Sequence, residues 1–400
     1  MQATRIIWEN LRNKMMRKKK VAIFMNYPAH YTDCVLNHLF ESEDISFDVI
    51  YYNRIPTDHI EWKREEKTGS HIFYCKKSYR IVKGEYYNPD AIVLFLKGKY
   101  DLAIISGRMP ITSFHLLRIC RRLRIPYIFA ADTAMLPIGR EVEDSERNKF
   151  KKHYDGIIRE SAGIWTPGLA GAAWWTEIYG KEIADKIVTG RYLLDNESIQ
   201  ITHSRNEARK SIRDRYEIDE KEFVILFVGG LTKERSIKTL LRIQNKLYEL
   251  DRQFHLMVIG YGEESGLIKE YMKEYPDRLC YIESVPYKEL NAYYFAADGY
   301  VHPGKEPYSL AVVQSVLNCI PTIATDCVGA AYDYIVSDRN GYMTPFGNDE
   351  ELTQAVVNIM DGKISVKTCE EECAKIIKYR NGKSIAGDLV KLINVSLENR

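Results

Sequence analysis

Short apolar runs alternate with amphipathic stretches along the chain from about residue 20. Apolar runs of four or five residues, at 21–25, 102–106 and 127–130, predict buried strands because they are too short for core helices. The stretch 111–123, between two of them, carries apolar residues at helical spacing. Strands that alternate with helices predict a parallel sheet with helices on both faces. The expected fold class is therefore α/β, with doubly wound, Rossmann-like sheets.

The alternation breaks once and then starts again. Residues 191–205, RYLLDNESIQITHSR, fit neither period, and the next strand is predicted at 223–228. Because 400 residues exceed one ordinary core, we expect two domains, 1–190 and 206–378, joined by this linker. Residues 379–400 form a last predicted helix.

Composition and charge exclude several classes of protein. A net charge of +2, from 57 basic and 55 acidic residues, argues against binding nucleic acid with the whole surface, and no known nucleic-acid motif occurs. The eight cysteines are scattered without Cys-x-x-Cys spacing, which favours reduced core cysteines in a cytoplasmic protein over a metal site. No apolar run approaches the roughly 18 residues needed to span a bilayer.

The first 20 residues form a basic segment with an apolar stripe. Residues 4–20 carry seven Lys or Arg and one Glu, and Ile7, Trp8, Leu11 and Met15 share one helical face. Such a segment suits the anionic inner face of a membrane; a helix docked on its own domain and a frayed terminus are the alternatives. A second basic cluster follows in the same domain, at Arg118, Arg121, Arg122 and Arg124.

Candidate chemistry gathers in residues 301–326, VHPGKEPYSLAVVQSVLNCIPTIATD. The pattern predicts a strand at 299–302, a loop with Glu306, a helix at 309–318 and a strand at 321–325. Ligands of open α/β sheets bind beyond the carboxyl ends of strands, and helix starts bind anions. A carboxylate at this place suits a ligand with hydroxyls and phosphates, although a solvated surface Glu is the simpler alternative.

Glu306-Pro307-Tyr308, with Gln314 eight residues after Glu306, resembles the donor-site signature of the retaining glycosyltransferases of family 4, glycosyl transferases group 1, which have the GT-B fold. The resemblance implies two facing Rossmann-like domains, the first for the acceptor and the second for the nucleotide sugar. It implies that Glu306 contacts the donor sugar. Gln314 stands where the family has a second Glu, on the ribose hydroxyls, and keeps hydrogen bonding without the charge.

Loops of the second unit match the same family in order. In Gly229-Gly230-Leu231-Thr232-Lys233-Glu234-Arg235, Arg235 takes the position of the family Lys that grips the diphosphate. Gly230 stands where an Arg is expected, a loss for which Lys233 could compensate. Gly260-Tyr261-Gly262 corresponds to a Gly-x-Gly turn beside the nucleotide. The expected donor-binding residues are Arg235, Lys233, Gly229, Gly230, Gly262, His302, Tyr308, Ser309 and Gln314.

In the first domain the resemblance points to Asp132. Family members commonly have a His after the strand equivalent to 127–130, where this chain has Asp132, which would orient a sugar hydroxyl, assist the acceptor or cap a helix. The stretches 26–28 and 328–333 are similar to a subset of the family found in bacterial capsule and lipopolysaccharide assembly. In GT-B enzymes the chain end commonly crosses back to the first domain, which we expect of 379–400.

The resemblance implies transfer of a sugar from a nucleotide diphosphate, of UDP or GDP type, to an acceptor hydroxyl, with retention of configuration and without a metal or other cofactor. The expected acceptor is a lipid-linked saccharide or a growing surface polysaccharide. Alternatives are a sugar- or nucleotide-binding scaffold of the same fold with lost catalysis, and hydrolysis or phosphorolysis. A nicotinamide oxidoreductase is disfavoured because neither 25–31 nor 229–235 contains Gly-x-Gly-x-x-Gly.

Overall fold

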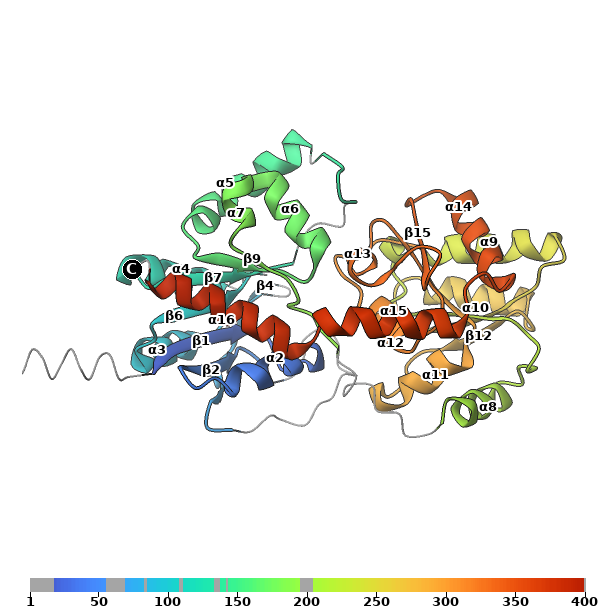
Figure 1. Cartoon of the computed structure of the whole chain (residues 1–400), viewed down its shortest axis with the longest axis horizontal. Helices are drawn as coiled ribbons and strands as arrows, with labels where there is room; N and C mark the ends of the chain where they lie inside the picture. The colour runs from blue at the N-terminus through green and yellow to red at the C-terminus, as the bar shows by residue number, and fades with distance from the viewer. Residues whose placement is uncertain are drawn as a thin grey trace, which may run out of the picture.

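The computed structural model describes residues 18–54, 69–82, 85–107, 111–132, 137–141, 143–194 and 204–398. Figure 1 shows two lobes, each with a sheet inside and helices outside. Within the described residues, one lobe holds a seven-stranded sheet of order β3-β2-β1-β6-β7-β8-β9, and the other a six-stranded sheet of order β12-β11-β10-β13-β14-β15. The described strands of both sheets pair in parallel. The expected α/β class is confirmed.

The first domain alternates strands and helices on either side of one irregular hairpin. Its elements are β1 (Lys19–Met25), α2 (His30–Phe40), β2 (Ile45–Tyr51), β3 (Ile72–Tyr74), β4 (Tyr79–Val82), β5 (Glu85–Tyr87), α3 (Pro89–Gly98), β6 (Leu102–Ser106), α4 (Ile111–Leu123), β7 (Tyr127–Ala130), α5 (Asp144–Arg159), β8 (Gly163–Trp165), α6 (Leu169–Tyr179), α7 (Lys181–Ala184) and β9 (Ile187–Val188).

The second domain repeats the alternation. Its elements are α8 (Arg205–Arg215), β10 (Val224–Val228), η1 (Lys233–Arg235), α9 (Ile237–Glu249), β11 (His255–Ile259), α10 (Ser265–Glu274), β12 (Leu279–Ile282), η2 (Tyr287–Glu289), α11 (Leu290–Ala296), β13 (Gly299–His302), α12 (Leu310–Leu317), β14 (Thr322–Thr325), α13 (Ala331–Tyr334), β15 (Gly341–Thr344), α14 (Asp349–Met360) and α15 (Val366–Tyr379).

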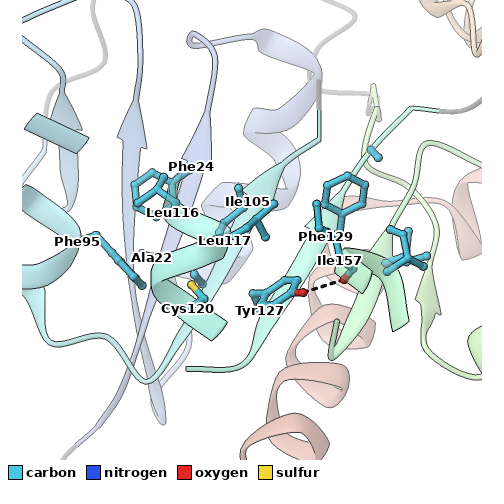
Figure 2. Packing of buried hydrophobic residues seen from close by; sticks show 14 of the residues in the cluster. Ala22, Phe24, Phe95, Ile105, Leu116, Leu117, Cys120, Tyr127, Phe129 and Ile157 are labelled. Carbon is cyan, nitrogen blue, oxygen red and sulfur yellow. Dashed lines mark hydrogen bonds between the residues drawn. The ribbon is translucent and has the colours of Figure 1, made fainter. Parts of the chain in front are cut away.

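Apolar side chains fill both faces of the first sheet. On one face, Phe24 of β1 and Ile105 of β6 pack against helix residues such as Phe95 and Leu116 (Figure 2). At the edge of this cluster the Tyr127 hydroxyl donates to the carbonyl of Ile157 at 2.8 Å, so the one polar atom of that ring is satisfied. Continuous apolar strands such as 21–25 are explained by this burial on both sides.

The last helix, α16 (Gly382–Glu398), belongs to the core of the first domain although it follows the second. Ile385, Leu389 and Ile393 are buried with β1 and α2 on the other face of the first sheet. In Figure 1, α15 lies on the second lobe and α16, drawn red, continues along the first. Two connections therefore join the domains, one near residue 194 and one near Arg380.

Several elements were not expected from the pattern. The strands β3, β4, β5 and β15 and the helices α7, α8 and α13 were not predicted. The helix α8 begins with a capping box, in which Ser204 and Glu207 exchange hydrogen bonds, and this Ser-x-x-Glu spacing could have revealed it. Residues 1–17 of the basic segment and 195–203 of the expected linker lie outside the described residues.

Candidate functional site

The site forms where the strand order of the second sheet reverses, between β10 and β13. Gly229 follows β10 and His302 ends β13, so both stand at the carboxyl edge of the sheet on the two sides of this switch point. Crevices at such points bind ligands in doubly wound sheets. The fold therefore places the loops of Arg235 and Glu306 next to each other.

The backbone ties these two loops together. The Lys305 amide donates to the Glu234 carbonyl at 2.7 Å. Gly304 packs so closely that an added Cβ would lie 2.3 Å from the Glu234 carbonyl oxygen, which explains the glycine at this position. On the other side, the Glu306 amide donates to the Cys327 carbonyl at 3.1 Å.

The Glu306 carboxylate is held by two side chains. Arg235 Nη2 donates to Oε1 at 2.5 Å, and the buried His302 ring places Nε2 at 3.0 Å from Oε2. Burial acts to raise the pKa of Glu306, but Arg235 and then His302 outweigh it and lower the pKa to about 2. Glu306 is therefore a carboxylate throughout the neutral range, able to accept hydrogen bonds but not to donate a proton.

The backbone beside this pair makes one close approach, at Gly229, and has one uncapped helix start, at α12. Gly229 has φ +151°, and an added Cβ there would meet Nη1 of Arg235 at 2.2 Å. Ser309, buried with φ +84°, precedes α12, whose start no described side chain caps. The first amides of α12 therefore remain available to a phosphate.

Three other expected donor residues lie on or against the loop that carries Arg235. Lys233 is exposed on the loop before Arg235, and Gly230 is next to Gly229. Gly262 packs on the loop backbone, because a Cβ there would lie 2.4 Å from the Leu231 carbonyl oxygen, and its amide donates to Ser265. These residues shape the loop around Arg235.

Gln314 is buried in α12 and is part of an amide network. Its Nε2 donates to Asn291 Oδ1 at 2.8 Å, and Asn318 Nδ2 donates to the same oxygen at 3.1 Å. Asn291, at the start of α11, was not predicted as a site residue. A neutral Gln suits this oxygen, whereas a carboxylate in the same rotamer would face it without a hydrogen.

Tyr308 points to the domain boundary. Its ring is buried and packs edge-on against Tyr192 of the first domain, with the centroids 6.1 Å apart. Arg380 donates to the Tyr308 hydroxyl at 3.2 Å and pairs with Asp333 at 2.8 Å. Asp333 also accepts from the Leu169 amide at the start of α6. Sequence reasoning missed Arg380 and Asp333.

Asp132 lies at the carboxyl end of β7 in the first domain. Its Oδ1 accepts from Arg191 Nη1 at 2.9 Å and from the Tyr192 hydroxyl at 2.6 Å. Both partners lie in the stretch expected to be linker, so the pattern gave no signal for them. The residues described contain no group of three or more His, Cys, Asp and Glu that could hold a metal ion.

Residues 208–381 match the family model of glycosyl transferases group 1. The match covers most of the second domain. An uncharacterized glycosyltransferase of Methanocaldococcus jannaschii is 25% identical over 165 residues, 38% of this chain and 40% of that relative. The alpha-monoglucosyldiacylglycerol synthase of Acholeplasma laidlawii is 20% identical over 292 residues, 67% of this chain and 70% of that enzyme. The chain thus spans less than half the length of the first of these relatives.

The fold is shared with solved structures. HepE of Anabaena, solved in complex with UDP and glucose, superposes with a TM-score of 0.66 at 14% identity, covering 94% of this chain and 100% of that one. The arrangement of the two domains is the GT-B fold, as the resemblance implied. The domain match and the fold together support a GT-B glycosyltransferase.

Proposed function

We propose that this chain transfers a sugar from a nucleotide diphosphate to an acceptor hydroxyl with retention of configuration, as a member of family 4. The observation that carries the proposal is the Arg235–Glu306–His302 group at the switch point of the second sheet. It combines one cation, one permanent carboxylate and free helix amides within one loop cluster. A phosphate and a polyhydroxylated sugar need these three kinds of group.

The residues divide the work by charge. Arg235, Lys233 and the amides of α12 would meet the negative charge that develops on the departing diphosphate, where fixed donors stabilise a transition state most. Glu306 would accept hydrogen bonds from sugar hydroxyls, and its negative charge would favour the oxocarbenium-like sugar. Gln314 Oε1 would accept from the ribose. The donor we propose is of UDP type, since HepE, with the same fold, was solved with UDP and glucose.

The acceptor we propose is a lipid-linked saccharide at an anionic membrane surface, as in bacterial capsule or lipopolysaccharide assembly. The first domain supports this with exposed apolar and basic side chains on two neighbouring helices, α3 and α4. Val93 and Leu96 of α3 and Phe114 of α4 are exposed, and Arg118 stacks on Phe114 at 4.3 Å, with Arg122 exposed farther along α4. In the part of the chain described, no helix is long and apolar enough to cross a bilayer.

The first test is calorimetric titration of the full chain with UDP, GDP and ADP, without added metal. One nucleotide should bind in the micromolar range, and Arg235→Ala should weaken it because the diphosphate loses its cation. Arg242→Ala is the matched control, since Arg242 makes an exposed ion pair with Asp349 on an outer helix. Binding of none of the three would contradict the proposal and favour a scaffold that has kept the fold.

Two further measurements test the finer parts. The anomeric configuration of the product, read by NMR, should equal that of the donor; inversion would contradict retention. Vesicles with anionic phosphatidylglycerol should sediment the protein, whereas phosphatidylcholine vesicles should not. Binding that is unchanged in Arg118→Glu/Arg122→Glu and after deletion of residues 1–18 would contradict the membrane contact.

A further inference from the structure

A small cavity opens at the switch point of the first sheet. The strand order reverses between β1 and β6, and the cavity, of about 110 Å³, is lined by residues that end or follow these two strands and by residues that follow β7 and β9. Its lining includes the polar side chains of Asn26, Ser106, Asp132, Arg191 and Tyr192. The first domain thus has its own group of polar side chains at the place where doubly wound sheets bind ligands.

Arg191 is the buried cation of this cavity. The residue is 7% exposed, and its guanidinium donates to Asp132 Oδ1 and to the Ser106 hydroxyl, both at 2.9 Å. Burial opposes its charge, but Tyr192 and Asp132 more than compensate and raise the pKa of Arg191. Its Nε is buried and has no hydrogen-bond partner among the described residues. Burying a charged guanidinium costs free energy, which a paired carboxylate offsets. Asp132 and Arg191 therefore act as a unit.

Tyr192 fixes the same carboxylate oxygen from another side. Its hydroxyl donates to Oδ1 of Asp132 at 2.6 Å, and burial raises the pKa of Tyr192, so the phenol keeps its proton. Both donors thus use Oδ1. In the described part of the chain no group donates to Oδ2, and the side chain is 27% exposed. The second oxygen is the one left to a ligand in the cavity.

The group is also linked to the donor site across the domain boundary. The Tyr192 ring packs against Tyr308, which is two residues from Glu306. On its other side Tyr192 packs edge-on against Tyr31 at 4.9 Å. The contact between the Tyr192 and Tyr308 rings therefore links the Asp132 group to the loop that carries Glu306.

A second buried arginine shows how a purely structural ion pair looks in this protein. The Arg213 guanidinium donates to four carbonyls and to Asp298 Oδ2. The bonds to Ala296, Asp219, Glu222 and Asp298 measure 2.8–3.0 Å, and the bond to Glu220 measures 3.4 Å. Asp298 Oδ1 accepts from Arg209 at 2.8 Å. Both carboxylate oxygens and each nitrogen of this arginine are used. The Arg191–Asp132 unit differs because, among the described residues, one carboxylate oxygen and one buried N–H have no hydrogen-bond partner, and a cavity lies beside them.

We infer that Arg191 and Tyr192 are positioning residues that hold the Asp132 carboxylate so that Oδ2 accepts a hydrogen bond from a substrate hydroxyl in this cavity. The inference rests on the proposed function and adds the first-domain half of the site. Fixed geometry matters because a misplacement of about 1 Å can cost about 100-fold in rate. No proton is transferred in this role. The substrate hydroxyl donates a hydrogen bond to Oδ2, and this bond orients the hydroxyl.

The test measures UDP binding and UDP release from UDP-glucose by the full chain, with and without added methyl glucosides. Arg191→Met should lower kcat about 100-fold and leave the Kd for UDP unchanged, because UDP is held by the second domain. Arg191→Lys should restore part of kcat, since it keeps the charge but not the fork that reaches both Asp132 and Ser106. Tyr192→Phe should lower kcat in the same direction.

The double variant Asp132→Asn/Arg191→Met separates positioning from stability. It should have the kcat of Asp132→Asn alone, because the two act as a unit, while its Tm rises above that of Arg191→Met, because no unpaired charge stays buried. Arg209→Met, which loses a partly buried ion pair far from the cleft, is the control that lowers Tm without changing kcat.

The outcomes distinguish the two proposals. UDP binding together with an unchanged kcat in both Arg191→Met and Arg191→Lys would overturn the inference and leave the proposed function standing. Losses that add in full between Asp132→Asn and Arg191→Met would also overturn it. Absence of UDP binding, or of UDP release in every condition, would count against the proposed function itself, and the inference would fall with it.

Discussion

Replacing Glu306 by Gln separates sugar contact from phosphate contact at the donor site. The carboxylate is 20% exposed and paired with Arg235 and His302. Its pKa is lowered from 4.5 to about 2, and at about 1.4 kcal/mol per unit the folded protein favours the ionised form by about 3 kcal/mol. Gln has the same shape and no charge, so Glu306→Gln removes up to this stabilisation at pH 7.

The sign of the pH dependence follows from the direction of the shift. A lowered carboxyl pKa gives stability that is present above pH 4.5 and is lost as the pH falls toward 2. The difference in unfolding free energy between wild type and Glu306→Gln should therefore be largest above pH 4.5 and shrink in acid. Urea titrations between pH 3 and 7 measure it. An equal difference at all pH values would refute the charge argument.

Ligand binding should change in the opposite direction from turnover. In the unliganded protein Glu306 competes with a diphosphate for Arg235, so Glu306→Gln should bind UDP as tightly as wild type or up to about tenfold more tightly, which equals about 1.4 kcal/mol. UDP release from UDP-glucose should fall by about 100-fold or more, the usual cost of one oriented group at a transition state. Arg235→Met should instead weaken UDP. If Glu306→Gln weakens UDP as much as Arg235→Met, the division of roles is wrong.

Three further predictions concern the domain boundary, the ribose and the crossing helix. Burial raises the pKa of Asp333 to about 6 against the opposing charge of Arg380. Wild type should therefore lose up to about 3 kcal/mol of stability as the pH rises from 4 to above 6. In urea titrations Asp333→Asn should lack this loss, and a loss that persists would contradict the assignment to Asp333. Gln314→Leu should weaken UDP up to about tenfold in calorimetry, the value of one hydrogen bond, and unchanged affinity would place the ribose elsewhere. Leu389 of α16 is fully buried against the first sheet, so Leu389→Ala should lower the free energy of unfolding by about 2–5 kcal/mol in urea titrations. Val395 of the same helix is exposed, so Val395→Ala should lower it little. Equal effects of the two variants would contradict the core role of α16.

Strand and helix periods were sufficient for most of the fold. Helix 111–123 and strand 127–130 have the predicted ends, because continuous apolar runs buried on both faces leave little ambiguity about a strand. The hairpin of β4 and β5 was missed because aromatic and charged residues are mixed there without alternation. The helix α8 was missed because its period is weak among many charges, although its capping box was readable.

Candidate site residues could be predicted from the sequence where they belong to a local motif. They could not be predicted where segments distant in the sequence come together. Glu306 and Arg235 were selected from motifs 71 residues apart, and the structure joins them by an ion pair. Tyr308, expected at the donor, is buried against Tyr192 and Arg380 at the domain boundary, and its role at the donor stays a prediction. Arg191 could not be found, because a buried arginine depends on a partner 59 residues away and no period encodes such a pairing.

The two domains hold a carboxylate in position in the same way. Each domain has a carboxylate beyond the carboxyl end of a strand, Glu306 in one and Asp132 in the other, and each carboxylate is held by an arginine from another loop. A carboxylate so held keeps its direction without help from a ligand, so the cost of ordering it has been met during folding. The two halves are joined by the Tyr192–Tyr308 contact and by Arg380, which binds Tyr308 and Asp333. On the proposed function, loosening either contact should slow turnover without weakening nucleotide binding, because the proposed nucleotide site lies in the second domain alone.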